Sequence, residues 1–318
     1  MDVLSEILAL IRINGSVLAE IQCGGTWGLD MGRGDGIPFH YVTEGECWLI
    51  SGMAPTRLSP GDLVVAPHWP FHALASSPEH PLVMLSTVIA ANGLPAWKGG
   101  TLDRPLVIRA GDDRHNVRIL SGVFTLEGRG AAMLIEQLPA LLHVGAQAEG
   151  LAPQLGTALD FIRQEGAVTR PGYVAVATRL MDLLFIQILR VVITQPMAKI
   201  GILAGLADAH VGRALAAIHA NPAGPWTVAN LATEAGLSRT VFAERFRQTV
   251  GSTPIQYVNR WCLMAAEEML ARPGIPIDII RRQLGFGSSF AFARAFRAYR
   301  GISPREYRIA VQQGSSEC

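Results

Sequence analysis

Two stretches near the C-terminal end of the chain carry serine, phenylalanine and arginine side chains in the same order. The first is "SRTVFAERFRQTVGSTPIQY" at 238–257 and the second is "SSFAFARAFRAYRGISPREY" at 288–307, with eight identities in twenty positions. Arginine binds phosphate oxygens and can donate two hydrogen bonds to the major-groove edge of guanine. The repeat therefore predicts two copies of one unit whose exposed side chains contact a nucleic acid.

The residues that the two copies share are those that begin, bury and end a helix. Two phenylalanines four positions apart fall on one helical face, a serine precedes the helix as an N-cap candidate, and a glycine can end it. A second helix with a glycine turn precedes each copy, so each unit is predicted to be a helix-turn-helix, at about 226–247 and about 276–297. The helix between them, of 18–19 residues, has a length of about 27 Å, which suits successive major grooves ~34 Å apart. The shared pairs are Ser238/Ser288, Phe242/Phe292, Ala243/Ala293, Phe246/Phe296, Arg247/Arg297, Gly251/Gly301, Pro254/Pro304 and Tyr257/Tyr307.

The charge distribution also indicates a polyanionic partner for this region. The 318-residue chain has a net charge of +1. Residues 210–310 carry 13 arginines and six acidic residues, a balance of +7, whereas residues 1–209 have a balance of −5. A basic region on an acidic body is typical of a protein that binds DNA through one domain. Chance variation is the alternative for the uneven charge, and a small helical bundle without a nucleic-acid partner is the alternative for the repeat.

Residues 209–310 resemble the DNA-binding domain of the AraC/XylS family of transcription regulators. The resemblance is carried by "NLATEAGLSRTVFAERFRQTVGSTPIQYV" and "DIIRRQLGFGSSFAFARAFRAYRGISPREYR". It implies that the second helix of each unit enters the major groove. By position, the implied DNA-binding residues are Ser238, Arg239, Thr240, Ala243, Glu244 and Arg247 in the first unit, and Ser288, Ser289, Phe290, Ala293, Arg294 and Arg297 in the second.

The side-chain chemistry at these positions is consistent with base reading. Arg294 could bind a guanine edge, Glu244 could accept a hydrogen bond from cytosine, and Thr240 could offer its methyl group to thymine. Arg247 and Arg297 occupy equivalent sites one turn later, and we interpret them as phosphate contacts that set the register. An ordinary exposed side chain is the alternative for each residue.

The first ~140 residues have the pattern of a β domain. Apolar runs of strand length, "ECWLIS", "DLVVAP", "LVMLSTVIA" and "PLVIRA", are separated by turns such as "SPGD". This pattern favours an antiparallel sandwich or barrel. From about Met133 the pattern is helical, and the apolar run 174–193 predicts a helix that is buried on more than one side, for instance against a second copy of the chain.

Histidines in this region are candidate metal ligands. "GDLVVAPHWPFHAL" places Gly61, Pro67 and His72 at the spacing of the second cupin motif, and "FHYVTEGECWL", with His40 and Glu44, is similar to a degenerate first motif. The region resembles the cupin-type sensor domain of one AraC/XylS branch, which implies a small β-barrel. A metal ion held by His40, Glu44 and His72, with His68 close by, is the cofactor to consider; structural histidines are the alternative.

The cysteines are relevant to redox sensing and to the cellular compartment of the protein. Cys23 and Cys47 are candidate redox sensors, because a thiolate near positive charge is reactive; a buried, inert thiol is the alternative. Cys262 and Cys318 complete the set of four, which has no metal-motif spacing. The N-terminus lacks the basic region of a secretory signal, and polar residues interrupt the most apolar run. We therefore expect a cytoplasmic protein with reduced thiols and no membrane partner.

The sequence as a whole predicts an α+β chain with two domains. We expect a cupin-like β-barrel with flanking helices over 1–195, a linker over 196–208, and an all-α domain of two helix-turn-helix units joined by a long helix over 209–310. The predicted function is a sequence-specific transcription regulator, not an enzyme, that binds double-stranded DNA as a homodimer under control of a small effector or a redox signal. The family resemblance adds RNA polymerase as a partner and activator as the expected mode. The alternatives are a metal-dependent cupin enzyme with an accessory helical domain, and a constitutive DNA-binding protein whose barrel only dimerises.

Overall fold

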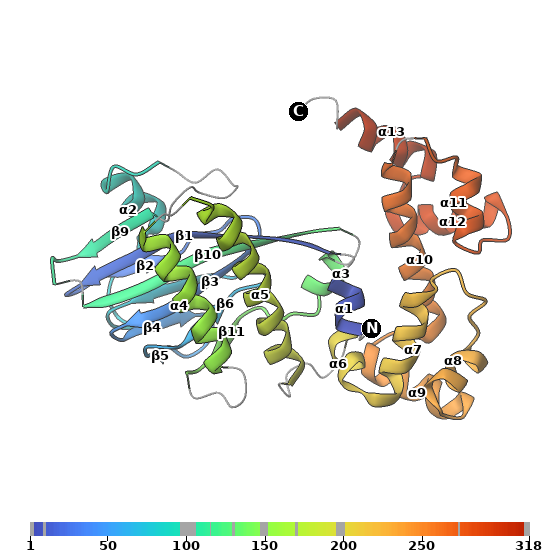
Figure 1. Ribbon diagram of the computed structural model, residues 1–318, viewed down its shortest axis with the longest axis horizontal. Helices are drawn as coiled ribbons and strands as arrows, with labels where there is room; N and C mark the ends of the chain where they lie inside the picture. The colour runs from blue at the N-terminus through green and yellow to red at the C-terminus, as the bar shows by residue number, and fades with distance from the viewer. Residues whose placement is uncertain are drawn as a thin grey trace. The chain divides into compact units, whose positions relative to one another are not determined.

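The computed structural model describes residues 3–8, 11–95, 106–114, 116–128, 131–146, 152–168, 171–194, 201–272 and 274–314. The chain forms two compact units. The sheet unit consists of Ile13–Leu126 with Leu138–Met197, and the helical unit consists of Ala198–Cys318 with Met1–Arg12 and Glu127–Gln137. The strands and the helices α4 and α5 belong to the sheet unit, and the helices from α6 to α13 belong to the helical unit (Figure 1).

The sheet unit contains two β-sheets that share one apolar core. The six-stranded sheet has the order β11-β6-β3-β10-β1-β9 and the five-stranded sheet has the order β5-β4-β7-β2-β8. The expected cupin-like fold is present, but the expected barrel differs in one detail, because the two sheets do not close into a single barrel. The strands of the second sheet have two to five residues, and among the described residues each of them pairs only within that sheet. The strands are β1 (Arg12–Gly24), β2 (Gly28–Asp30), β3 (Ile37–Glu44), β4 (Cys47–Ser51), β5 (Thr56–Leu58), β6 (Leu63–Val65), β7 (His72–Ala75), β8 (Val83–Met84), β9 (Leu106–Gly111), β10 (Val117–Glu127) and β11 (Leu142–Val144).

Alternation along β3 separates the two faces of the six-stranded sheet. Val42 belongs to the core shared with the second sheet, to which Leu49 and Leu74 contribute from β4 and β7. Phe39, which has the opposite orientation in the strand, packs against Phe124 of β10 with the two rings tilted and their centroids 5.1 Å apart. The second face of this sheet therefore needs a separate apolar cover.

Two helices provide this cover, α4 (Ala152–Val168) and α5 (Tyr173–Thr194), which pack against each other over the six-stranded sheet (Figure 1). The ring of Phe185 in α5 lies 5.1 Å from that of Phe124. The helix expected over 174–193 is thus present and buried on the side of the sheet. Its other side leaves Val176 and Leu183 exposed.

The apolar run 82–90 was expected to be a strand, and most of it is a helix. Only Val83 and Met84 pair, as β8, and α2 (Leu85–Ala91) follows directly. Leu85, Val88 and Ile89 recur at helical spacing and pack on the shared core. The helical spacing of the apolar side chains therefore decides the secondary structure of this segment, although its β-branched residues favour a strand.

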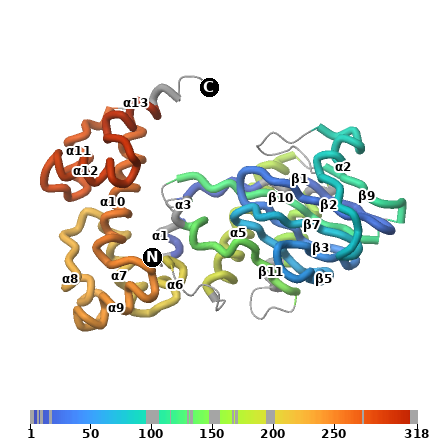
Figure 2. Tube along the Cα trace, turned by 180° about the vertical axis from the view of Figure 1, so that it is seen from behind, coloured from blue at the N-terminus to red at the C-terminus, as the bar shows by residue number. Residues whose placement is uncertain are grey.

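The helical unit is built around one long helix, α10 (Pro254–Ala271). The pair α8 and α9 contacts one part of it, and the pair α11 and α12 contacts another (Figure 2). Both helix-turn-helix units and the connecting helix of 18 residues agree with the sequence-based prediction. The remaining helices are α6 (Ile202–Ala207), α7 (Ala209–Ala220), α8 (Val228–Ala235), α9 (Arg239–Val250), α11 (Ile277–Gln283), α12 (Ser289–Arg300) and α13 (Pro304–Gly314).

The boundaries of this unit differ from the expected domain limits. The segment expected as a linker over 196–208 contains α6, whose Ile202 and Leu203 are buried against the unit. Helix α1 (Val3–Leu8) packs against α7, and Glu136, just after α3 (Ala131–Ile135), forms an ion pair of 2.7 Å with Arg260. Two short segments from within 1–195 thus belong to the helical unit. Within the part of the chain that the structure describes, no helix is long and apolar enough to cross a membrane.

Candidate functional site

Helices α9 and α12 each bury one face and expose the other. Phe242 and Phe246 anchor α9, and Phe292 and Phe296 anchor α12, each with no more than 1% of its surface exposed. Gly251 and Gly301 end the two helices with positive φ values of 82° and 77°, as the sequence predicted. Ser238 and Ser288 both occupy the N-cap position, and the Ser288 hydroxyl accepts a hydrogen bond from the backbone of Ala291 at 3.1 Å.

The residues implied as DNA contacts lie on the free faces of these two helices. Phe290 is 75% exposed, which is unusual for a phenylalanine. The structure brings the implied residues of each unit together on one helix; whether they touch DNA stays a prediction. The exposed members are Ser238, Arg239, Thr240, Glu244 and Arg247 on or before α9, and Ser288, Ser289, Phe290, Arg294 and Arg297 on or before α12, while Ala243 and Ala293 are half-buried.

Ion pairs distinguish the arginines of α12 from one another. Arg300 pairs with Glu267 of α10, and Arg297 lies 3.4 Å from Glu306 of α13. Among the described residues, Arg294 has no carboxylate partner; its guanidinium lies 5.8 Å from the ring centroid of Phe290 instead. Arg294 is therefore the arginine of this helix most available for an external acceptor.

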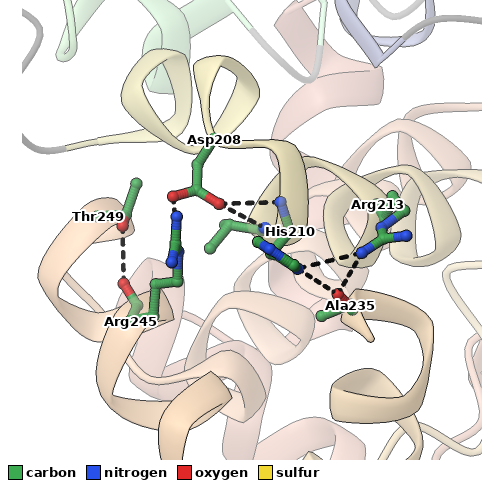
Figure 3. A network of polar contacts seen from close by, with 7 residues as sticks. Asp208, His210, Arg213, Ala235, Arg245 and Thr249 are labelled. Atoms are coloured by element: carbon green, nitrogen blue, oxygen red, sulfur yellow. Dashed lines mark hydrogen bonds and ion pairs between the residues drawn. The ribbon is translucent and has the colours of Figure 1, made fainter. Parts of the chain in front are cut away.

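Hydrogen bonds and one ion pair of Asp208 connect α7 to α9 (Figure 3). The Asp208 carboxylate caps α7 by accepting hydrogen bonds from the backbone of His210 and Val211, and its second oxygen lies 2.8 Å from Nε of Arg245 in α9. Burial alone would raise the pKa of Asp208, but these backbone hydrogen bonds and Arg245 outweigh burial and lower it. One carboxylate thus caps α7 and joins it to α9, the helix that carries Arg239 and Glu244.

An aromatic cluster fills the core beneath the first unit. His219 of α7 is stacked on Trp261 of α10 at 4.1 Å, and its Nε2 lies 2.7 Å from the hydroxyl of Tyr257. Its Nδ1 is buried with no hydrogen-bond partner among the described residues. Burial lowers the pKa of His219 to about 4. The imidazole is therefore neutral and structural at physiological pH.

The sheet unit brings together two of the three predicted metal ligands. His40 of β3 and His72 of β7 meet in the core between the sheets, with 3.0 Å between their Nε2 atoms. Glu44 lies elsewhere, at the exposed end of β3, where it pairs with Arg118 at 3.2 Å. His68 contacts the carbonyl of Leu138. The structure therefore does not bring the three predicted ligands His40, Glu44 and His72 together.

The contacts of the two imidazoles define a continuous hydrogen-bonded chain. The strand register places Ser121 directly opposite His40, and the Ser121 hydroxyl lies 2.9 Å from Nδ1 of His40. At the other end, Nδ1 of His72 lies 2.8 Å from the carbonyl oxygen of Pro70 and must donate to it. His72 Nε2 then accepts from His40 Nε2, and His40 Nδ1 accepts from Ser121. Both rings are neutral in this arrangement, and burial lowers the pKa of each.

This donor set does not fit a metal ion. Metal sites in proteins use three or four ligands from His, Cys, Asp and Glu, with neighbouring groups that orient them. Among the described residues, no group of three such side chains converges. The two imidazoles satisfy each other instead, so they are structural histidines, the alternative that the sequence left open.

Cys23 and Cys47 are buried in the same apolar core, with 0% and 1% of their surface exposed. Burial raises the pKa of both thiols, to about 12 for Cys47. A protonated, buried thiol reacts slowly with oxidants, so the structure favours buried, inert thiols over redox sensors at these two positions. Cys318 lies outside the described residues.

Sequence reasoning missed three of the residues described above. The sequence does contain a signal for Asp208, since an aspartate before a helical segment is a common N-cap. It contains no signal for Ser121 or His219, because the role of Ser121 depends on strand register and that of His219 on packing between helices.

The comparisons with known proteins agree with both units. Residues 2–194 match the family model described as Cupin, and residues 231–310 match the model described as a helix-turn-helix domain. A putative AraC-like transcription regulator of Streptomyces lividans is 32% identical over 97% of this chain and 98% of its own length. The HTH-type transcriptional regulator AlkR of Acinetobacter baylyi is 28% identical over 97% of this chain and 99% of its own length.

The solved structures that are similar to this chain include a complex with DNA. The DNA-binding domain of AdpA in complex with a target DNA is 28% identical and covers 35% of this chain and 99% of its own, with a TM-score of 0.33. The match to the Cupin model over most of the N-terminal region and the similarity to regulators over the full length confirm the family and the function that the repeated arginine-rich unit predicted. The chain belongs to the AraC-like transcription regulators, DNA-binding proteins that here carry an N-terminal cupin domain and a C-terminal helix-turn-helix domain.

Proposed function

We propose that each protomer binds one asymmetric DNA site through α9 and α12. The observation that carries this proposal is the pair of capped helix-turn-helix units on a single continuous helix, α10, with unlike side chains on their free faces. Glu244 stands in the first unit where Arg294 stands in the second. Carboxylate and guanidinium groups prefer different bases, so the two halves of the site should differ in sequence.

Selection of bound duplexes from random DNA with the purified full chain tests this proposal. We expect enrichment of a site with two unlike boxes about one helical turn apart, and an affinity for it that falls linearly on a log–log plot against salt concentration. Recovery of no sequence-specific, salt-sensitive site would contradict the proposal.

We further propose that the chain acts in the cytoplasm as a homodimer through the exposed apolar side chains of α4 and α5. Phe161 on α4 and Val176 and Leu183 on α5 are 48%, 37% and 43% exposed. Apolar surface of this kind on paired helices is typical of a contact between proteins. Leu183→Glu should convert the dimer to monomer in sedimentation experiments, whereas Val107→Glu, an equally exposed position on the edge strand β9, should not.

For regulation, we propose a small effector bound by the sheet unit rather than oxidation of its cysteines, because both thiols of that unit are buried and protonated. RNA polymerase is the proposed partner, with activation as the proposed mode. Transcription in vitro with purified polymerase, with and without a metabolite mixture, tests both statements. Equal transcription with and without the metabolite mixture would instead favour constitutive binding to DNA.

A further inference from the structure

The exposed pair Phe290 and Arg294 is an unusual feature of the helical unit. The two residues lie four apart on α12 and therefore on one face of the helix. Phe290 exposes 75% of its surface to water, although the neighbouring core accepts Phe292 and Phe296. Leaving a phenylalanine in solvent forgoes the free energy of its burial, so a contact partner outside the fold is indicated.

The contact between the two side chains joins them into one surface. The Arg294 guanidinium lies 5.8 Å from the centroid of the Phe290 ring, within the range of a cation–π interaction. Arg297 and Arg300, the other arginines of this helix, lie against Glu306 and Glu267. Among the residues that the structure describes, Arg294 has no carboxylate partner, and the contact with the ring restricts where its guanidinium points.

We propose that this pair reads one base step, an adjacent thymine and guanine in the second box of the DNA site. The inference rests on the proposed function and adds the identity of two bases. The Phe290 ring packs on the C5 methyl group of thymine, and Arg294 donates two hydrogen bonds to O6 and N7 of guanine. Because successive base pairs are ~3.4 Å apart, side-chain tips held together by a ring contact suit neighbouring base pairs.

The first unit provides a comparison within the same chain. Its residues at the equivalent positions are Thr240 and Glu244, which replace the ring by a small methyl-bearing side chain and the guanidinium by a carboxylate. Glutamate accepts from cytosine and cannot donate to guanine. The thymine–guanine step is therefore expected in the second box alone.

The test uses the full chain and the duplex that it enriches from random DNA. In that duplex, deoxyuridine replaces the thymine, which removes only the methyl group, and 7-deazaguanine replaces the guanine, which removes only N7. We expect deoxyuridine to weaken binding by wild type about fourfold, as for one buried methylene, and to leave Phe290→Ala unaffected. We expect Arg294→Ala to lose roughly 5- to 150-fold and to become insensitive to 7-deazaguanine.

The controls separate the inference from the proposed function. Phe71→Ala and Arg57→Ala remove an exposed phenylalanine and an exposed arginine from the sheet unit, and both should bind as wild type. Two enriched boxes without the step, or equal sensitivity to deoxyuridine in wild type and Phe290→Ala, would overturn the inference alone. Absence of any enriched duplex would overturn the proposed function as well.

Discussion

Replacing Phe296 by alanine should strongly destabilise the second helix-turn-helix unit and weaken specific DNA binding. Phe296 is fully buried, and its ring lies 6.0 Å from that of Phe292 and 5.5 Å from that of Tyr307. Removal of a buried phenylalanine costs about 3–5 kcal/mol in the free energy of unfolding. This is a large share of the ~5–15 kcal/mol that stabilises a typical domain.

Hydrogen exchange of the full chain, resolved by peptide, measures this effect. Peptides that cover α11 and α12 should lose protection in Phe296→Ala, while peptides from the sheet unit should keep theirs. Phe290→Ala is the matched control, because it truncates the same residue type on the same helix at a position that is 75% exposed. Its protection should match wild type, and unchanged protection of α12 in Phe296→Ala would show that the Phe296 ring does not anchor this helix.

Acidification should destabilise the helical unit through His219. The folded pKa of about 4 lies below 6.5, the usual pKa of a histidine in an unfolded chain, so the unfolded chain takes up a proton first as the pH falls. The stabilisation is fully present above pH 6.5 and is lost between pH 6.5 and about 4, with a total change of about 3 kcal/mol. The physical cause is burial against Trp261 and Tyr257.

Chemical denaturation at a series of pH values from 7 to 4 tests this prediction. His219→Gln should be less stable than wild type at pH 7 and should lose less stability on acidification. His210→Gln is the control, since it changes a half-buried histidine on the same helix. An acid loss of equal size in wild type and His219→Gln would locate the sensitivity in another group.

The helical unit could be predicted from the sequence because its determinants are local. Shared phenylalanines four apart, glycines that take positive φ and serine or threonine caps specify each helix within about a dozen residues. Thr253 and Gln256 illustrate this, since they form the reciprocal cap that "STPIQ" indicates before α10. The internal repeat then shows that the whole unit occurs twice.

The sheet unit could be predicted only in outline because its contacts join distant residues. His40 meets Ser121 and His72 through strand pairing and sheet stacking, across 81 and 32 positions of the chain. A motif spacing suggests that histidines are near one another, but it does not reveal that Glu44 faces Arg118 instead. Likewise, composition did not separate the two residues of β8 from the helix α2.

The membership of short segments in each unit was also beyond sequence reasoning. Helix α1 and the residues around Glu136 pack with the helical unit, although both lie within the N-terminal region. The pair Glu136–Arg260 joins residues 124 positions apart, and no local pattern marks either as a partner. Such contacts are decided by tertiary packing rather than by propensity.

The central claim is that both helix-turn-helix units of one chain bind the same DNA site. The most direct test is how the affinity for DNA depends on the spacing between the two boxes of that site. Helix α10, with 18 residues and a length of about 27 Å, fixes the separation of α9 and α12. Insertion of about five base pairs, half a helical turn, rotates one box to the opposite face of the duplex. The affinity of the full chain should then fall roughly tenfold or more, to the level of a duplex with one box. Equal affinity for the original and the lengthened site would contradict the account.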